Sequence, residues 1–313
     1  MTTPPHLASS ASADAAANPF LALRSRYILA LGALLMVVMF AGSVYVVLAE
    51  RQLVPAVSDD PILTPVSLIV FWTLLAIAIF RLGQQQNLNV RYLFGQNRPQ
   101  FSVAFGVLLV LSLLLFSLGI SATVLYLLSL KFPGYVSQLL ASSNILDGDI
   151  SAYPAVYEML MLFLVLVYAP LVEEIVFRGI LLQRWGQKWG IRSGVIASSV
   201  LFGVLHLNNP VGLTLFGLAM ALLYVKTQSL WVPIGCHALN NLAAVGIDWL
   251  SKVTAGGQTT TVSDIQELWW ISLIPIAVSL PFLVWFVWRS WPHKTEAIPY
   301  VANASRVHPK SVG

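Results

Sequence analysis

Charge is scarce in this chain of 313 residues: charged residues make up 10% of it, against 58% hydrophobic residues. An ordinary soluble domain carries roughly a quarter of charged residues. A chain so poor in charge cannot cover a globular surface with polar groups, which excludes a soluble protein. The mean hydropathy of +0.79, with ten tryptophans and ten tyrosines, instead predicts a membrane protein with aromatic residues at both interfaces.

Cysteine is almost absent as well, because Cys236 is the only one. The sequence therefore excludes an intramolecular disulfide and any zinc or iron–sulfur site built from several cysteines. Three protease signatures are also missing: the His-Glu-x-x-His zinc motif, the Gly-x-Gly-Asp aspartyl motif and the rhomboid-like Gly-x-Ser-Gly motif.

Long hydrophobic segments are abundant. Crossing the hydrocarbon core takes roughly 20 apolar residues in a helix. The candidate spans are about 27–49, 62–81, 102–130, 155–184, 191–208, 211–226, 230–250 and 268–289. We therefore expect an all-α, polytopic membrane bundle of about eight transmembrane helices.

The basic residues settle the expected orientation. With a cytoplasmic N-terminus, three of the 17 basic residues lie outside, Arg51, Lys131 and Lys252, and the other 14 lie inside. This distribution follows the positive-inside rule, so we expect both termini in the cytoplasm. Membrane topology explains the basic pI without a nucleic-acid partner. The short loops and Trp-rich ends favour a multi-pass protein of a bacterial inner membrane.

One membrane domain accounts for most of the chain. Residues 1–22 are rich in Ala, Ser and Pro and predict a disordered tail without a signal peptide. Residues 23–291 form the expected membrane domain, with a motif-bearing core at about 154–250. The polar stretch 292–313 predicts a flexible C-terminal tail.

Ionisable residues inside a predicted span are costly and indicate a functional site. Glu174 and Arg178 lie four residues apart, so they share a helix face and predict an ion pair. Glu173 is rotated by about 100° and lacks that partner. This favours Glu174 as the neutralised residue and Glu173 as the one free for chemistry, unless all three are solvated at the end of the span.

Two further spans carry polar residues at matching depth. His206 follows Phe202 by four residues, and Asn241 follows His237 by four. With ~1.5 Å of rise per residue, Glu173 and these groups reach the middle of the bilayer together. A lone membrane histidine is usually a hydrogen-bonding group, but two of them with a glutamate and an asparagine favour a site.

The residue types allow two hydrolytic mechanisms. In one, Glu173 takes a proton from water, His206 holds that water, and His237 and Asn241 donate hydrogen bonds to the oxyanion. In the other, Glu173, His206 and His237 bind zinc with an open position for water. Both predict hydrolysis of an amide bond, and either no cofactor or zinc.

These residues resemble the CPBP family of CAAX-protease and bacteriocin-processing membrane enzymes. Its three motifs are Glu-Glu-x-x-x-Arg, Phe-x-x-x-His and His-x-x-x-Asn. Here they are Glu173-Glu174 to Arg178, Phe202 to His206 and His237 to Asn241, within about 70 residues. The resemblance implies an eight-helix bundle with a cavity open to the cytosol, and a protease that activates water through Glu173.

We therefore expect an intramembrane endopeptidase, of glutamate or zinc type. Its partners would be membrane lipid and a peptide or lipidated protein substrate. Glu174, Arg178 and Phe202 would support the catalytic residues. One alternative is a non-catalytic scaffold or bacteriocin-immunity protein. Another is a proton-coupled transporter, which the lack of an inverted repeat disfavours.

Overall fold

The structure is a computed structural model that describes residues 18–50, 60–95, 101–141, 151–255 and 260–307. In this part of the chain the regular elements are helices, and one isolated β-bridge joins Gly95 to Ser229. The elements are η1 (Pro19–Leu21), α2 (Ser25–Glu50), α3 (Leu63–Gln85), α4 (Val90–Phe94), α5 (Val103–Ser129), α6 (Pro133–Ala141), α7 (Pro154–Phe163), η3 (Leu164–Tyr168), α8 (Ala169–Glu174), η4 (Ile175–Leu182), α9 (Gln183–Trp189), α10 (Ile191–Leu205), α11 (Pro210–Thr227), α12 (Trp231–Ala255), α13 (Val262–Glu267), η5 (Trp269–Ser272), α14 (Leu273–Ser290) and α15 (Pro299–Val307).

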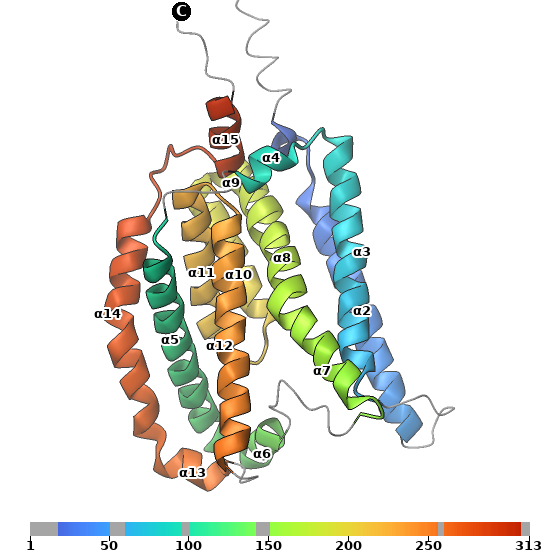
Figure 1. Ribbon diagram of the computed structural model, residues 1–313, viewed down its shortest axis with the longest axis vertical. Helices are drawn as coiled ribbons and strands as arrows, with labels where there is room; N and C mark the ends of the chain where they lie inside the picture. Colours follow the sequence, from blue (N-terminus) through green and yellow to red (C-terminus); the bar gives the residue numbers. More distant parts are fainter. Residues whose placement is uncertain (1–17, 51–59, 96–100, 142–150, 256–259, 308–313) are drawn as a thin grey trace, which may run out of the picture.

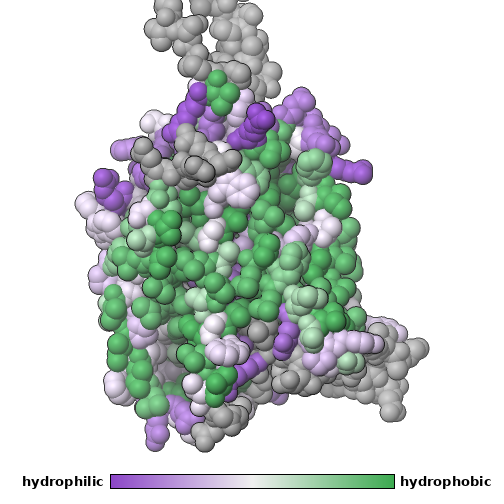
Figure 2. Space-filling view, viewed as in Figure 1, coloured by the Kyte–Doolittle hydropathy of each residue, from purple (hydrophilic) through white to green (hydrophobic). Residues whose placement is uncertain are grey.

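The long helices form a bundle, and both ends of the described chain lie at the same end of it (Figure 1). Figure 2 shows a hydrophobic band between two hydrophilic ends. Many large apolar side chains of the long helices are exposed, such as Phe40, Leu127 and Val278. Since water would disfavour such a surface, these side chains are suited to contact lipid, and the polytopic helical fold predicted from composition is confirmed.

Six helical segments are long and apolar enough to cross a membrane, in the part of the chain that the structure describes. They are Ser25–Gly42, Leu63–Gln85, Val103–Ser129, Pro154–Trp189, Pro210–Thr227 and Trp269–Ser290. The other two predicted spans correspond to α10 and α12. The 15 residues of α10 extend only about 22 Å, and α12 has 25 residues but carries the polar site residues. The number of crossings therefore stays a prediction.

The fourth of these segments, Pro154–Trp189, is a continuous helical path of 36 residues. Two stretches of it, η3 and η4, are π-helical, and the short α-helical segment α8 lies between them. A π-helical turn is wider than an α-helical one, and such turns are frequent at functional sites. Here η3 ends five residues before Glu173, and η4 begins directly after Glu174.

Helices α10 and α11 form a tight antiparallel hairpin. Any side chain at Gly203 of α10 would collide with Thr214 and with the Pro210 carbonyl of α11, so only glycine permits this approach. Asn209 begins α11 by accepting a hydrogen bond from Gly212 N, and its Nδ2 donates to Ser117 Oγ of α5 at 2.6 Å. This hydrogen bond attaches the tip of the hairpin to the neighbouring helix.

The start of the described chain is packed, unlike the disordered tail predicted for residues 1–22. Phe20 is fully buried, and its ring meets Tyr300 edge to face at 5.2 Å. Asn18 Nδ2 donates to Gln187 Oε1 at 3.0 Å. A three-residue 3₁₀ turn is too short to be predicted from composition, because its stability comes from this docking. Residues 1–17 lie outside the described residues.

Residues 292–307, the described part of the predicted flexible tail 292–313, are also packed, and residues 308–313 lie outside the described residues. Residues 299–307 form α15, and Tyr300 N donates to Gln183 Oε1 at 3.3 Å. Asn303 Nδ2 donates to the carbonyls of Tyr92 and Gln228 at 3.0 and 2.9 Å. The prediction was wrong here because a polar, nine-residue helix gains its stability from tertiary contacts rather than from its own sequence.

Candidate active site

The ion pair predicted from the four-residue spacing is present. Arg178 Nη1 donates to Glu174 Oε1 at 2.9 Å, and both side chains are fully buried. Arg178 Nη2 also donates to the carbonyl of Gly217 on α11 at 3.0 Å. A buried ion pair is tolerated only when additional hydrogen bonds complete it, and the Gly217 carbonyl provides one.

Glu173 lies on a different face of the same helix and points toward both histidines. Its Oε2 is 3.9 Å from His206 Nε2 and 3.9 Å from His237 Nε2. These distances are too long for direct hydrogen bonds, and Oε2 is buried without a hydrogen-bond partner among the described residues. A buried polar atom without a partner in a folded protein calls for an explanation, of which a catalytic role is one.

The second nitrogen of each imidazole is held by an acceptor. His206 Nδ1 lies 2.7 Å from the carbonyl of Phe202, and His237 Nδ1 lies 2.8 Å from Glu174 Oε1. Because a carbonyl and an ionised carboxylate only accept, Nδ1 carries the proton in both rings. Both Nε2 atoms therefore face Glu173 and are available to a reacting molecule.

Charge balance connects these groups. The buried cluster contains two carboxylates, Glu173 and Glu174, and one guanidinium, Arg178. A buried net charge is costly, so one more proton, held by Glu173 or by an imidazole, would make the cluster neutral. Such a proton would lie among the three groups that face one another at 3.9 Å.

Asn241 occupies the place that its spacing from His237 predicts, and it contacts the π-helical segment η3. Its Nδ2 donates to the carbonyl of Val165 at 2.8 Å. A side-chain amide carries two N–H donors, so this contact uses one and leaves the other. Asn241 thus ties α12 to the wide turn that precedes the two glutamates.

Phe202 lies at the centre of an aromatic group around the histidines. Its buried ring is 4.4 Å from the His206 ring and 5.9 Å from the His237 ring, centroid to centroid. The Arg178 guanidinium carbon lies 4.6 Å from the centroid of the same ring. Phe202 therefore packs against one residue of each motif, which explains its position four residues before His206.

The site is reached past His206. The side chain of His206 is 32% exposed, whereas those of Glu173 and His237 are 9% and 6% exposed. His206 is the C-cap of α10, and the next residue, Leu207, is 85% exposed. A reactant would therefore pass the more exposed His206 first and reach the more deeply buried Glu173 after it.

The three proposed zinc ligands are not arranged around a common metal position. Two ligands of one tetrahedral zinc lie about 3.4 Å apart, given bonds of about 2.1 Å. Glu173 Oε2 is 3.9 Å from each Nε2, and no group of three His, Cys, Asp or Glu residues within the described ranges could hold a metal ion. The set as arranged does not fit zinc.

Sequence reasoning missed three contributors to the site. Phe216 of α11 packs edge to face on His237 at 5.0 Å, and the carbonyls of Val165 and Gly217 bind Asn241 and Arg178. Backbone carbonyls leave no signal in a sequence. The glycine at position 217 is a weak sequence signal, because a side chain there would lie 3.3 Å from Arg178 Nη2.

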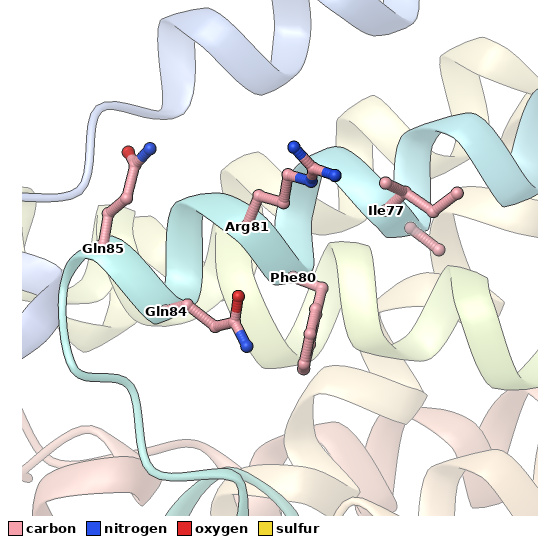
Figure 3. Close-up of a pocket in the computed structure, with 6 residues that line it drawn as sticks. Ile77, Phe80, Arg81, Gln84 and Gln85 are labelled. Carbon is pink, nitrogen blue, oxygen red and sulfur yellow. The ribbon is translucent and has the colours of Figure 1, made fainter.

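A separate hollow of about 700 Å³ lies along α3, away from the motif residues. Its lining residues, between Ala76 and Gln85, all come from that helix. In Figure 3, Phe80 and Gln84 extend from one side of the helix, and Ile77, Arg81 and Gln85 from the other. This hollow contributes nothing to the arrangement around Glu173.

Comparison with known proteins covers the segment that carries the motifs. Residues 155–243 match the family model described as "Type II CAAX prenyl endopeptidase Rce1-like". A Bacillus subtilis (strain 168) protein described as "Putative membrane peptidase YdiL" is 34% identical over 88 residues, which are 28% of this chain and 36% of that relative. The match thus spans little more than a third of the relative's length. No solved structure matches the chain significantly.

The matched segment begins in α7 and ends in α12, so it contains all three motifs and the two π-helical turns. Outside it, the described helices provide the apolar surface and the packing around the site. Residues 155–243 are therefore similar to Rce1-like CAAX prenyl endopeptidases and to a membrane peptidase, in agreement with the resemblance that the three motifs carry.

Proposed function

We propose that the chain is an intramembrane endopeptidase that hydrolyses a peptide bond of a membrane-associated or lipidated peptide, with a water activated by Glu173. The observation that carries the proposal is the buried, unpartnered Oε2 of Glu173, which faces both imidazole Nε2 atoms at 3.9 Å. The family match to an Rce1-like prenyl endopeptidase supports this substrate class.

In the proposed reaction, Glu173 removes a proton from a water beside His206, and the resulting hydroxide attacks the peptide carbonyl. A positioned general base of this kind accelerates a reaction by roughly 10²- to 10⁴-fold. The tetrahedral intermediate then collapses, its C–N bond breaks, and the proton on Glu173 passes to the leaving amine. The water and the peptide bond are thereby converted to one carboxylic acid and one amine, and Glu173 returns to its starting state.

In this proposal His237 and Asn241 stabilise the oxyanion. The second N–H of Asn241 is a neutral donor. His237 donates from Nε2 when its ring is doubly protonated, and Glu174 at Nδ1 would stabilise that cation. Removing one oxyanion donor in a hydrolase costs about 10²- to 10³-fold in rate. His206, the more exposed imidazole, holds the attacking water.

The test compares Glu173→Gln with Glu174→Gln in the full-length chain. Membrane peptides from cells that express wild type or Glu173→Gln are compared by mass spectrometry, and a peptide that differs becomes the substrate for the purified protein. We expect Glu173→Gln to keep its thermal unfolding temperature and to lose cleavage. Glu174→Gln should lose stability in addition to cleavage, because Glu174 is part of the buried ion pair.

Four outcomes would contradict the proposal. Cleavage that survives Glu173→Gln would exclude this residue as the base. An immunity phenotype that persists in the same variant without any cleavage would favour a scaffold, and proton flux lost without cleavage would favour a transporter. Cleavage abolished by EDTA and restored by zinc would show that the donor set closes around a metal.

A further inference from the structure

A basic hollow lies at the end of the bundle that holds both ends of the described chain (Figure 1). It has a volume of about 460 Å³ and is formed by two segments, the beginning of α2 and the last turns of α9. Its lining residues are Arg24, Ser25, Arg26, Leu29, Arg184, Trp185, Lys188 and Trp189. None of them belongs to the site around Glu173, so this hollow is a second feature of the molecule.

Four of the lining residues are cations that have no acidic partner among the described residues. Arg24, Arg26, Arg184 and Lys188 make no ion pair with a carboxylate in the described part of the chain. Neutral contacts hold some of them: Arg184 Nη1 donates to the carbonyl of Phe20 at 2.6 Å.

These cations repel one another. The positive end of the helix dipole of α2 begins at Ser25, between Arg24 and Arg26, and adds to the repulsion. An anion bound in the hollow would relieve it.

The hollow also has an apolar side. Trp189 is 52% exposed and Leu29 is 38% exposed, and the Lys188 ammonium lies 5.1 Å from the Trp189 ring centroid. Trp185 Nε1 donates to Ser25 Oγ at 3.2 Å, which joins the two segments. Tryptophan beside arginine and lysine at the end of a membrane helix is typical of the lipid headgroup region. A free phosphate would use the cations and leave the apolar side uncovered.

We propose that this hollow binds an anionic phospholipid, with the phosphate headgroup among the cations and an acyl chain along Leu29 and Trp189. Basic pockets between membrane helices bind anionic lipid headgroups in this way. The lipid would hold the beginning of α2 against α9. Because α9 is the end of the helical path that carries Glu173, lipid binding would stabilise the helix on which the site is built. The proposal does not depend on the reaction that the site performs.

The experiment measures thermal unfolding of the full-length protein in detergent as lipid is added. The probes are phosphatidylglycerol, zwitterionic phosphatidylcholine and inorganic phosphate. The test variant is Arg26→Gln with Lys188→Gln, which removes one exposed cation from each segment. The control variant is Lys294→Gln with Arg306→Gln, which removes the same charge from exposed positions outside the hollow.

We expect phosphatidylglycerol to raise the unfolding temperature of wild type and control, and phosphatidylcholine and phosphate to have little effect. The test variant should need about 30-fold more phosphatidylglycerol, because each basic residue contributes about fivefold in affinity for an anionic lipid. An equal shift with phosphatidylcholine would overturn the proposal in favour of general solvation by lipid. An equal shift with inorganic phosphate would make the hollow a free-anion site, and an unchanged response of the test variant would place the lipid elsewhere.

Discussion

Oε1 of Glu174 accepts hydrogen bonds from His237 Nδ1 at 2.8 Å and from Arg178 Nη1 at 2.9 Å. One buried carboxylate oxygen therefore holds a residue of α12 and a residue of its own helix. This arrangement gives the two adjacent glutamates different roles. Glu174 fixes the ring of His237, and Glu173 keeps an oxygen free to face both imidazoles.

The first prediction concerns the ion pair. Arg178→Ala leaves Glu174 as a buried charge without its guanidinium, so we expect the free energy of unfolding to fall by about 3–5 kcal/mol. Denaturant unfolding in detergent, followed by tryptophan fluorescence, measures this loss. The double variant Glu174→Gln, Arg178→Gln should recover part of it, since it removes both charges. Equal stability of Arg178→Ala and wild type would contradict the prediction, because it would show that water solvates the Glu174 carboxylate.

The second prediction separates the two roles of Asn241. Asn241→Ala leaves the half-buried Val165 carbonyl without this donor, which costs about 1–3 kcal/mol of stability. If the second amide N–H also serves the oxyanion, the cleavage rate falls by about 10²-fold or more. Stability and cleavage are measured on the same preparations.

A matched variant with the same stability loss is the control for Asn241→Ala. The control variant is Thr73→Val. It removes the 2.6 Å hydrogen bond to Tyr168, which joins α3 to the helical path that carries Glu173, and it leaves the contacts of the histidines unchanged. A rate loss equal in the two variants would leave Asn241 with a structural role alone.

The sequence predicted those contacts of the site that join residues of one helix. Glu174 and Arg178 lie on one helix, so their four-residue separation sufficed to predict the ion pair. The hydrogen bond between His237 and Glu174 joins two helices, and no spacing within one helix predicts it. Residue types alone left zinc open, whereas the distances of 3.9 Å in the folded chain do not fit it.

The irregular parts of the fold escaped prediction for a related reason. The π-helical segments η3 and η4 consist mostly of apolar residues, a pattern that predicts ordinary α-helix. The contact that η3 makes with Asn241 joins residues far apart in the sequence. Helix α10 ends at Leu205, short of the predicted boundary at 208, because His206 takes the C-cap. Element type was predictable from apolar runs, while these details depend on tertiary contacts.

The third prediction concerns pH. The carboxyl of Asp60 accepts hydrogen bonds from Ile62 N at 2.9 Å, Ser151 Oγ at 2.7 Å and Ala152 N at 2.8 Å. The backbone N–H of Ile62, followed by the Ser151 hydroxyl, holds the pKa of Asp60 below its usual value. A lowered pKa in the folded state stabilises the fold above the ordinary Asp pKa of about 4, and this contribution is lost as the pH falls below it.

Asp60→Asn tests this by removing the titration. We expect the unfolding temperature of wild type to fall more between pH 6 and pH 3 than that of Asp60→Asn. The difference should be small, because Asp60 is only partly buried. Identical pH dependence in the two proteins would show that the folded carboxyl titrates at its ordinary value.

The last prediction concerns α15. Asn303 is buried, and its Nδ2 donates to the carbonyls of Tyr92 and Gln228. Asn303→Ala leaves both carbonyls without this donor, so we expect a loss of about 1–3 kcal/mol in the free energy of unfolding. Ala304→Ser, at the neighbouring position, makes no such change and serves as the control.

Hydrogen exchange then locates the effect of Asn303→Ala. Protection should fall across α15 and α4, which Asn303 joins through Tyr92, and should stay unchanged across α5. Local loss without global unfolding would follow from the position of α15 at the end of the bundle, outside the helices that surround Glu173. Uniform loss of protection would instead make α15 part of the same cooperative unit as the site, and cleavage activity would then fall in parallel with stability.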